Sequence, residues 1–407
     1  MSSSADDRQV VITGAGAVSA LGFGADVLWD AMKAGRVGIA PLVHPRAESL
    51  RVRVAAQVPA FDPSTLFDER TLPLLDRVSQ FGLLAANEAM AQSGLHFDEA
   101  SGTRAAVIVG TGVGGETTQD AASEKLYGEN SQRLHPLTIV RIMANAVSSH
   151  ICVRHGITGP SFAVSSACAS ANHAIAQAVL AIRSGLVDVA ITGGTEACLS
   201  YGVFRAWEAM RVLSDDTCRP FCRQRHGLVL GEGAGMFVIE SLAHARARGA
   251  KVLAHIAGVG MSADAGDIVA PSDAGAARAM RAALADARMD PADVDYINAH
   301  GTGTLANDVT ETRAIHMALG SHAMHPAVSS TKSMHGHALG ASGALELIAV
   351  MGALTEGVIP PTMNALEPDP ACNLDIVFHA ARQTPVRAAL SNSFAFGGLN
   401  AVLALRA

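Results

Sequence analysis

One cysteine lies where its thiol could act as a nucleophile. Cys168 follows a short apolar run, Phe162 to Val164, and precedes an alanine-rich stretch that is typical of a helix. Such a strand-to-helix turn places the sulfur at a helix N-terminus, where unpaired backbone N–H groups and the helix dipole favour the thiolate. Because the thiolate is the nucleophilic form of cysteine, the pattern predicts covalent catalysis at Cys168.

Two short motifs occur twice in the chain. Ala-Val-Ser-Ser stands at 163–166, before Cys168, and again at 327–330, before Lys332 and His337. Gly-Thr-Gly stands at 110–112 and again at 301–303, directly after His300. The repeats predict two related halves, residues 1–250 and 251–407, whose turns bring Cys168, His300, Lys332 and His337 to one central cleft.

Short β-rich runs alternate with helical stretches along the chain, which predicts an α/β fold. Two glycine-rich segments are candidates for cofactor loops. The segment at 14–19 lacks an acidic residue about 20 positions later for a ribose, and the segment at 110–115 lacks the Lys-Ser/Thr of a P-loop. We interpret the first as a tight turn and the second as a place of close backbone packing.

Composition narrows the function classes. The chain has 407 residues, of which 49% are hydrophobic, so it can bury a large core. Its net charge of −7, with no basic run, argues against a nucleic-acid partner. The start of the chain, Met1 to Asp7, lacks the pattern of a signal peptide, and no unbroken apolar stretch looks long enough to span a bilayer. We therefore expect a cytoplasmic protein without a membrane anchor.

The six cysteines show no disulfide spacing, which suits a reducing compartment. Only Cys218 and Cys222 are close together, and no second pair of ligands follows them. A zinc site at this pair is not expected.

Four segments in register resemble the beta-ketoacyl-ACP synthases, specifically the elongating Cys-His-His type. The resemblance runs from Val10 to Leu405 and rests on these motifs: Ser166-Ala167-Cys168-Ala169-Ser170, Asn298-Ala299-His300-Gly301-Thr302-Gly303-Thr304, Ser329 to His337 with Gly340, and Asn392-Ser393-Phe394-Ala395-Phe396-Gly397-Gly398. It implies a thiolase-like, five-layered αβαβα fold of two duplicated halves, usually as a homodimer. It also implies decarboxylative condensation of an acyl group on Cys168 with malonyl-ACP, with no cofactor beyond the phosphopantetheine arm of acyl carrier protein.

The same resemblance implies a role for each matched residue. His300 and His337 would stabilise the enolate, Lys332 with Glu346 would order the site, and the backbone N–H groups of Cys168 and Phe396 would form an oxyanion hole. Thr302 and Thr304 would bind the phosphopantetheine arm, while Phe396, Val113 and Trp207 would line the acyl pocket. The residues that align with a monovalent-cation site in some family members are Asn298, Glu346, Ser391 and Asn392.

The chain also departs from the family pattern. Cys222 replaces an aspartate, and Leu399 replaces a threonine. Ala395 replaces a glycine next to Phe396, the residue that matches the family's gate over the acyl pocket, and should stiffen that gate. Pro73-Leu74-Leu75 stands where housekeeping members carry basic residues for the acidic carrier, although Arg70 and Arg77 are nearby. These departures suggest a dedicated carrier or a second ketosynthase-like subunit, in a specialised pathway such as nodulation-type acyl chains, polyenes or polyketides.

Two other functions are open. A biosynthetic thiolase would need a second cysteine near the C-terminus, where this chain has Asn392-Ser393-Phe394. A non-catalytic subunit that sets chain length in a heterodimer would usually lack the nucleophile, which is present here. The intact set of Cys168, His300 and His337 favours the condensing enzyme.

Overall fold

Two sheets with the same strand order form the centre of the protein. The computed structural model describes residues 9–407, so the prediction made from Met1 to Asp7 lies outside the described residues. The first sheet has the order β1-β8-β7-β5-β6 and the second β9-β16-β15-β10-β11-β13, and a short antiparallel pairing of β1 with β9 joins them. The strands of the first sheet are β1 (Val10–Ser19), β5 (Ala105–Gly110), β6 (Ser161–Val164), β7 (Val189–Glu196) and β8 (Gly233–Ser241). Those of the second are β9 (Ala254–Ala263), β10 (Tyr296–Asn298), β11 (Ala327–Ser329), β13 (Asp375–Ile376), β15 (Ala388–Ala395) and β16 (Leu399–Arg406).

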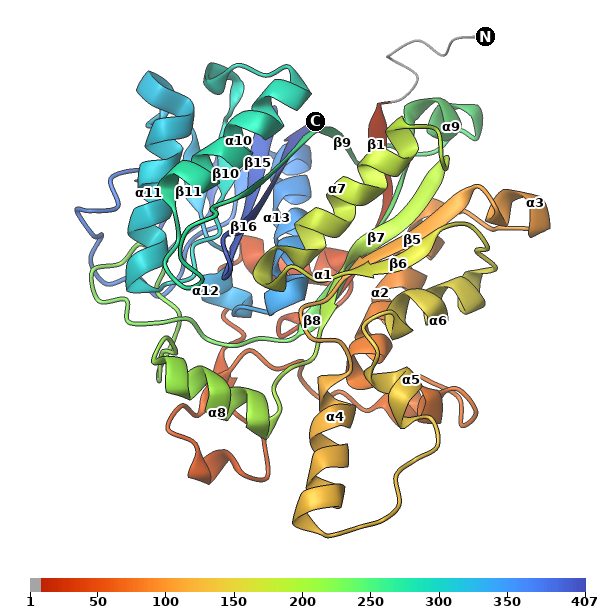
Figure 1. Cartoon of the computed structure of the whole chain (residues 1–407). Helices are drawn as coiled ribbons and strands as arrows, with labels where there is room; N and C mark the ends of the chain where they lie inside the picture. Colours follow the sequence, from red (N-terminus) through yellow and green to blue (C-terminus); the bar gives the residue numbers. More distant parts are fainter. Residues whose placement is uncertain (1–8) are drawn as a thin grey trace.

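Helices fill the three remaining layers. In Figure 1, α7 (Ser170–Arg183) and α13 (Ser342–Glu356) lie between the sheets, α2 (Arg77–Ser93) and α6 (Ala146–His155) cover the first sheet, and α10 (Asp273–Ala287) and α11 (Leu305–Leu319) flank the second. The observed layers confirm the predicted α/β class and five-layered αβαβα arrangement. The other helices are α1 (Ala25–Lys33), α3 (Glu99–Gly102), α4 (Glu116–Ser123), α5 (Thr138–Ile142), α8 (Tyr201–Met210), α9 (Leu242–Ala247) and α12 (Lys332–His335). Short two-residue strands are β2 (Gly22–Phe23), β3 (Ala40–Pro41), β4 (Val54–Ala55), β12 (Val358–Ile359) and β14 (Arg382–Gln383).

The repeated tetrapeptide marks equivalent places in the two sheets. Its first copy is on β6 and its second on β11, and each strand lies beside the equivalent parallel neighbour, β5 or β10. Parallel neighbours end at the same edge, so the turns after β5 and β6 share an edge of the first sheet and the turns after β10 and β11 share the equivalent edge of the second. The division at residue 250 stays a prediction.

Small residues let the layers approach one another. Gly110 ends β5, and a Cβ there would lie 2.4 Å from the backbone of Ser170 at the start of α7. The expected close backbone packing at 110–115 is therefore confirmed. The tight turn predicted at 14–19 is wrong, because this segment lies within β1, where added Cβ atoms on Gly14 and Gly16 would each lie 2.1 Å from a carbonyl oxygen of α2.

The central helix α13 is strongly apolar and almost entirely buried. Together with the preceding turn, Leu339–Glu356 is the one candidate membrane span among residues 9–407, and 83% of that window is buried inside the protein. Burial between two sheets explains its apolar composition, as is usual for a core helix.

Candidate active site

Cys168 lies in a tight turn between β6 and α7. The turn, Ala167–Ala169, places Ala167 in the left-handed region with φ of 48°, and Cys168 is 3% exposed. The hydroxyl of Ser170 holds the turn, since it accepts from the Ser166 N–H and donates to the Ala167 carbonyl. The sulfur is therefore at the N-terminal end of α7, as the sequence predicts.

The surroundings of Cys168 do not favour the thiolate that its position at a helix N-terminus led us to expect. Burial raises the pKa of Cys168 to about 11, although the charge of Lys332 and the N–H groups of Phe396 and Cys168 all favour the thiolate. The desolvation cost of a buried anion exceeds these effects. In the free protein the sulfur is therefore a thiol, and the position at a helix N-terminus does not by itself supply a thiolate.

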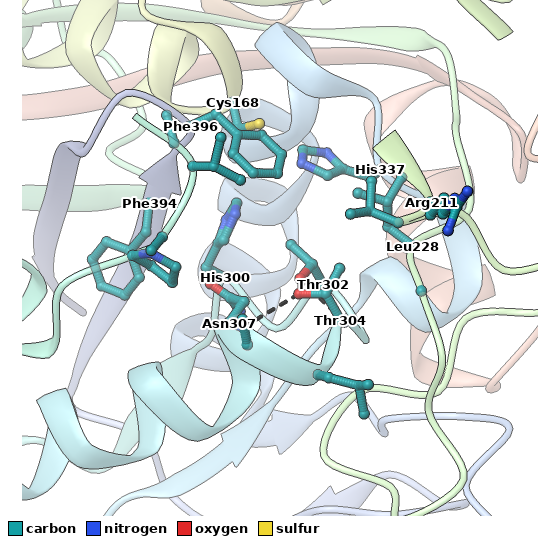
Figure 2. Close-up of a pocket in the computed structure, with 18 of the residues that line it drawn as sticks. Cys168, Arg211, Leu228, His300, Thr302, Thr304, Asn307, His337, Phe394 and Phe396 are labelled. Atoms are coloured by element: carbon teal, nitrogen blue, oxygen red, sulfur yellow. Dashed lines mark hydrogen bonds between the residues drawn. The ribbon is translucent and has the colours of Figure 1, made fainter. Parts of the chain in front are cut away.

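Two histidines from the second half face the sulfur. His300 follows β10 and His337 follows α12, and the side-chain nitrogen and sulfur atoms of Cys168, His300 and His337 lie within 4.8 Å of one another. The imidazole centroids are 5.5 Å apart with nearly perpendicular planes. Figure 2 shows both rings beside Cys168. The structure thus brings together the three residues that the sequence predicts to meet.

Neighbouring donors determine the tautomer of each imidazole. Nδ1 of His300 is 3.4 Å from the ammonium of Lys332, which can only donate, and Nδ1 of His337 accepts from the N–H of Leu339 at 3.1 Å. Burial and the charge of Lys332 lower the pKa of both histidines well below its usual value, so both are neutral. Each Nε2 therefore carries a hydrogen. A soft metal ion would need the Nε2 lone pairs, so this arrangement suits donation to an oxyanion better than metal binding.

Lys332 is completely buried and paired. Its ammonium forms a salt bridge with Glu346 and donates to the carbonyl of His300 at 2.7 Å. Burial raises the pKa of Glu346, and the nearby ammonium opposes that rise. Lys332 thereby links the turn after β11, the turn after β10 and the central helix α13.

A cavity of about 280 Å³ leads to these groups. Thr302 and Thr304 line it, and their hydroxyls lie 3.0 Å apart. Phe394 and Phe396 form part of its wall, with Phe396 next to Cys168 and Phe394 next to His300 (Figure 2). Of the residues predicted to bind substrate, Thr302, Thr304 and Phe396 thus share one cavity.

Val113 and Trp207 do not line this cavity. Trp207 packs against the ring of Phe396 with a centroid distance of 5.8 Å, and Val113 is 47% exposed. Trp207 therefore lies behind a residue of the cavity wall, and the assignment of both residues to an acyl pocket stays a prediction.

The four residues predicted to hold a cation share an unusual feature. Each has a buried oxygen without a hydrogen-bond partner: Asn298 Oδ1, Glu346 Oε2, Ser391 Oγ and Asn392 Oδ1. The amide nitrogens of the two asparagines donate to Tyr296 and Glu311, so the free atoms are the oxygens. Unpartnered buried oxygens cost free energy, and a hard cation would offset that cost.

Sequence reasoning missed two buried carboxylates that shape the site. Glu311 accepts from the N–H groups of His300 and Gly301, and Glu196 accepts from those of Gly112 and Gly340. Burial raises the pKa of each to about 7. A charged residue at the end of the apolar strand β7 was the available signal for Glu196.

Comparison with known proteins agrees with this geometry. The family models "Beta-ketoacyl synthase, N-terminal domain" and "Beta-ketoacyl synthase, C-terminal domain" match residues 7–245 and 253–366. "Nodulation protein E" of Rhizobium meliloti (strain 1021) is 49% identical over 98% of this chain and 99% of its own length. "3-oxoacyl-[acyl-carrier-protein] synthase 2" of Staphylococcus aureus (strain COL) is 38% identical over 98% of both chains.

Solved structures give the same result. "The ishigamide ketosynthase/chain length factor" has a TM-score of 0.92 at 38% identity, covering 98% of this chain and 99% of that chain. A type II polyketide ketosynthase, solved in complex with its acyl-carrier protein, has a TM-score of 0.88 at 28% identity over 98% and 99%. The chain belongs to the beta-ketoacyl synthase family, has the thiolase-like fold, and is an acyltransferase of the condensing type.

Proposed function

We propose that the condensation proceeds through an acyl group on Cys168, with His300 and His337 stabilising the enolate of the malonyl unit. The observation that carries this assignment is the meeting of the Cys168 thiol with two neutral imidazoles within 4.8 Å, at the end of one cavity. Both imidazoles present Nε2–H groups because of their partners on Nδ1.

In the first stage, Cys168 takes the acyl group from a carrier. The sulfur–carbon bond to Cys168 forms, the bond to the pantetheine sulfur breaks, and the thiol proton passes to the departing pantetheine thiolate. The N–H groups of Phe396 and Cys168 would hold the tetrahedral oxyanion, a role supported by their preference for negative charge at the sulfur.

In the second stage, the malonyl thioester loses carbon dioxide. The electron pair left behind forms an enolate, whose oxygen accepts from the two Nε2–H groups. The enolate carbon attacks the Cys168 thioester, and the β-ketoacyl product leaves on the carrier while Cys168 regains a proton. Each oxyanion donor is worth about 3 kcal/mol of barrier.

Lys332 acts in this proposal as a positioning residue. Its ammonium faces Nδ1 of His300 and ties His300 to Glu346 on α13. A monovalent cation held by the oxygens of Asn298, Glu346, Ser391 and Asn392 would stabilise the same region by satisfying those oxygens, and takes no part in bond making.

The substrates arrive on acyl carrier protein and no other cofactor is needed. The relatives named above support the carrier, since one is a carrier-protein synthase by name and another was solved with its acyl-carrier protein. Similarity to nodulation protein E, to a ketosynthase/chain length factor and to a type II polyketide ketosynthase favours a specialised acyl or polyketide pathway. We assign that pathway to the cytoplasm.

A second copy of this chain is the partner that the exposed edge of the first sheet fits best. β6 is the last strand of that sheet, and Ser161 and Phe162 on it are exposed, Phe162 by 42%. An exposed strand edge with an aromatic side chain favours pairing with another strand. One similar solved structure is described as a ketosynthase/chain length factor, so a heterodimer is the alternative arrangement.

Intact-mass spectrometry tests the chemistry. Wild type and Cys168→Ala are incubated with octanoyl-N-acetylcysteamine and then with malonyl carrier protein. We expect one octanoyl adduct on wild type, none on Cys168→Ala, and release of a product longer by two carbons. An adduct that persists in Cys168→Ala would contradict the assignment of the nucleophile.

A further inference from the structure

The entrance of the active-site cavity carries exposed apolar side chains. Val269 and Leu305 line the cavity, yet they are 54% and 65% exposed, so they lie at its opening. Ile268 is 75% exposed, and Leu399 is 36% exposed. We call Ile268, Val269, Leu305 and Leu399 the entrance patch.

Backbone hydrogen bonds hold the entrance patch next to the active site. The N–H of Gly397 donates to the carbonyl of Ile268 at 2.8 Å, and the N–H of Asp264 donates to the carbonyl of Gly398 at 2.8 Å. The loop that carries Ile268 therefore lies against the segment that follows Phe396, the residue beside Cys168. A protein that delivers an acyl group through this entrance would therefore contact the entrance patch.

The charges beside the patch provide no basic field. Arg211 lines the entrance and is exposed, whereas Asp264 lies against Gly398, and N–H groups of its own loop lower the pKa of Asp267. One cation beside two carboxylates does not attract an acidic partner.

The segment expected to attract an acidic carrier is also unsuited to that task. Arg77 forms two hydrogen bonds with Glu232 and lies over the rings of Phe61 and Phe81, so its charge is already paired. The exposed charges of the preceding segment are Arg70 and three carboxylates: Asp62, Asp68 and Glu69. Arg77 is therefore already paired and does not by itself form a basic docking site, although Lys125, His135 and Arg141 line the same pocket.

We propose that the entrance patch is the docking surface for the carrier protein, and that it recognises an apolar surface around the pantetheine-bearing serine rather than the carrier's acidic charge. This inference rests on the proposed function, because it assumes that the acyl group reaches Cys168 on a carrier. Exposed aliphatic side chains around a substrate entrance, without an excess of basic charge, fit an apolar contact. Leu399, where the family has threonine, adds to that apolar character.

The test compares two acyl donors for Cys168. One is the octanoyl-loaded fatty-acid carrier protein of Rhizobium meliloti, and the other is octanoyl-N-acetylcysteamine, which lacks a protein surface. The second-order rate of Cys168 acylation is measured by intact mass for wild type, Ile268→Gln and Leu305→Gln. The matched control is Met324→Gln, an exposed apolar residue just before β11, at the opposite end of that strand from the site.

We expect each entrance variant to lower the ratio of the carrier rate to the small-donor rate by about tenfold, the effect of one interface contact. Met324→Gln should leave the ratio unchanged. The wild-type carrier rate should fall less than about threefold between about 50 and 500 mM salt, because apolar contacts are not screened.

Three results would overturn the docking proposal: an unchanged ratio in both entrance variants, a steep loss of the carrier rate with salt, or a carrier rate no higher than that of the small donor. Failure of wild type to react with octanoyl-N-acetylcysteamine is a separate outcome. It would contradict the proposed function itself.

Discussion

At the scale of single residues, burial dominates the chemistry of the site. Lys332 and two backbone N–H groups favour a thiolate at Cys168, yet burial of the sulfur, with a smaller effect from the charge of Glu196, raises its pKa to about 11. The same burial keeps His300 and His337 neutral. In the free protein these three groups are therefore uncharged, and negative charge develops next to them only when a substrate reacts.

This state predicts how Cys168 reacts with a small alkylating agent. Below its pKa the thiolate fraction rises about tenfold for each pH unit, so the iodoacetamide rate at Cys168 should keep rising from about pH 7 to about pH 10. Mass spectrometry of the Cys168 peptide measures this rate, and Cys168→Ala reports reaction at other cysteines. A plateau reached below about pH 8 would mean that the thiolate is already formed in the free protein.

Lys332 and Glu346 form a buried ion pair, so removal of one partner should destabilise the fold more than removal of both. Lys332→Met leaves the Glu346 carboxylate buried beside apolar groups, so we expect a loss of about 3–5 kcal/mol in the free energy of unfolding, measured with urea. The double variant Lys332→Met with Glu346→Leu should regain stability but not condensation, because Nδ1 of His300 has lost its donor.

A surface pair provides the control for that experiment. Lys33 pairs with Glu356, and the two side chains are 32% and 40% exposed. Lys33→Met should cost less than about 1 kcal/mol because water screens an exposed pair. An equal loss in both lysine variants would contradict a special role for burial at Lys332.

At the scale of elements, sequence patterns predict where strands end but not what packs on them. The repeated Ala-Val-Ser-Ser correctly predicts two equivalent turns, because the motif includes the strand and its end. Gly14 and Gly16 do not form the turn that their spacing predicts, since a glycine that admits a neighbouring helix looks the same in sequence as one that bends the chain. Only the contact with α2 separates the two cases.

The buried oxygens of β10, β15 and α13 predict dependence on a monovalent cation. A cation that binds the folded state raises the melting temperature, so wild type should melt about 2–4 °C higher in potassium chloride than in tetramethylammonium chloride at equal ionic strength. Ser391→Ala removes one of the four oxygens and should reduce this difference. Ser93→Ala, whose hydroxyl donates to the carbonyl of Met90 far from these strands, should melt with the wild-type difference. Identical melting of wild type in the two salts would contradict the cation site.

At the scale of the whole molecule, the two-sheet architecture and the meeting of Cys168, His300 and His337 could be predicted because short motifs repeat on equivalent strands. The pKa of Cys168, the carboxylates Glu196 and Glu311, and the packing of Trp207 on the ring of Phe396 could not. Such features depend on which segments, far apart in the sequence, pack together and exclude water, and a local sequence pattern does not predict this packing.

The exposed edge strand β6 predicts that the protein forms a homodimer. If β6 pairs with the same strand of a second copy, wild type should scatter light as a dimer of twice 41.8 kDa. Phe162→Lys places a charge on the exposed edge strand and should give a monomer, since charged side chains on an edge oppose strand pairing. Leu186→Lys changes a residue that is 58% exposed in the loop after α7, away from β6, and should remain dimeric. A monomeric wild type that pairs only with a second ketosynthase-like chain would contradict the homodimer and establish the heterodimer, because the same edge would then be reserved for a different partner.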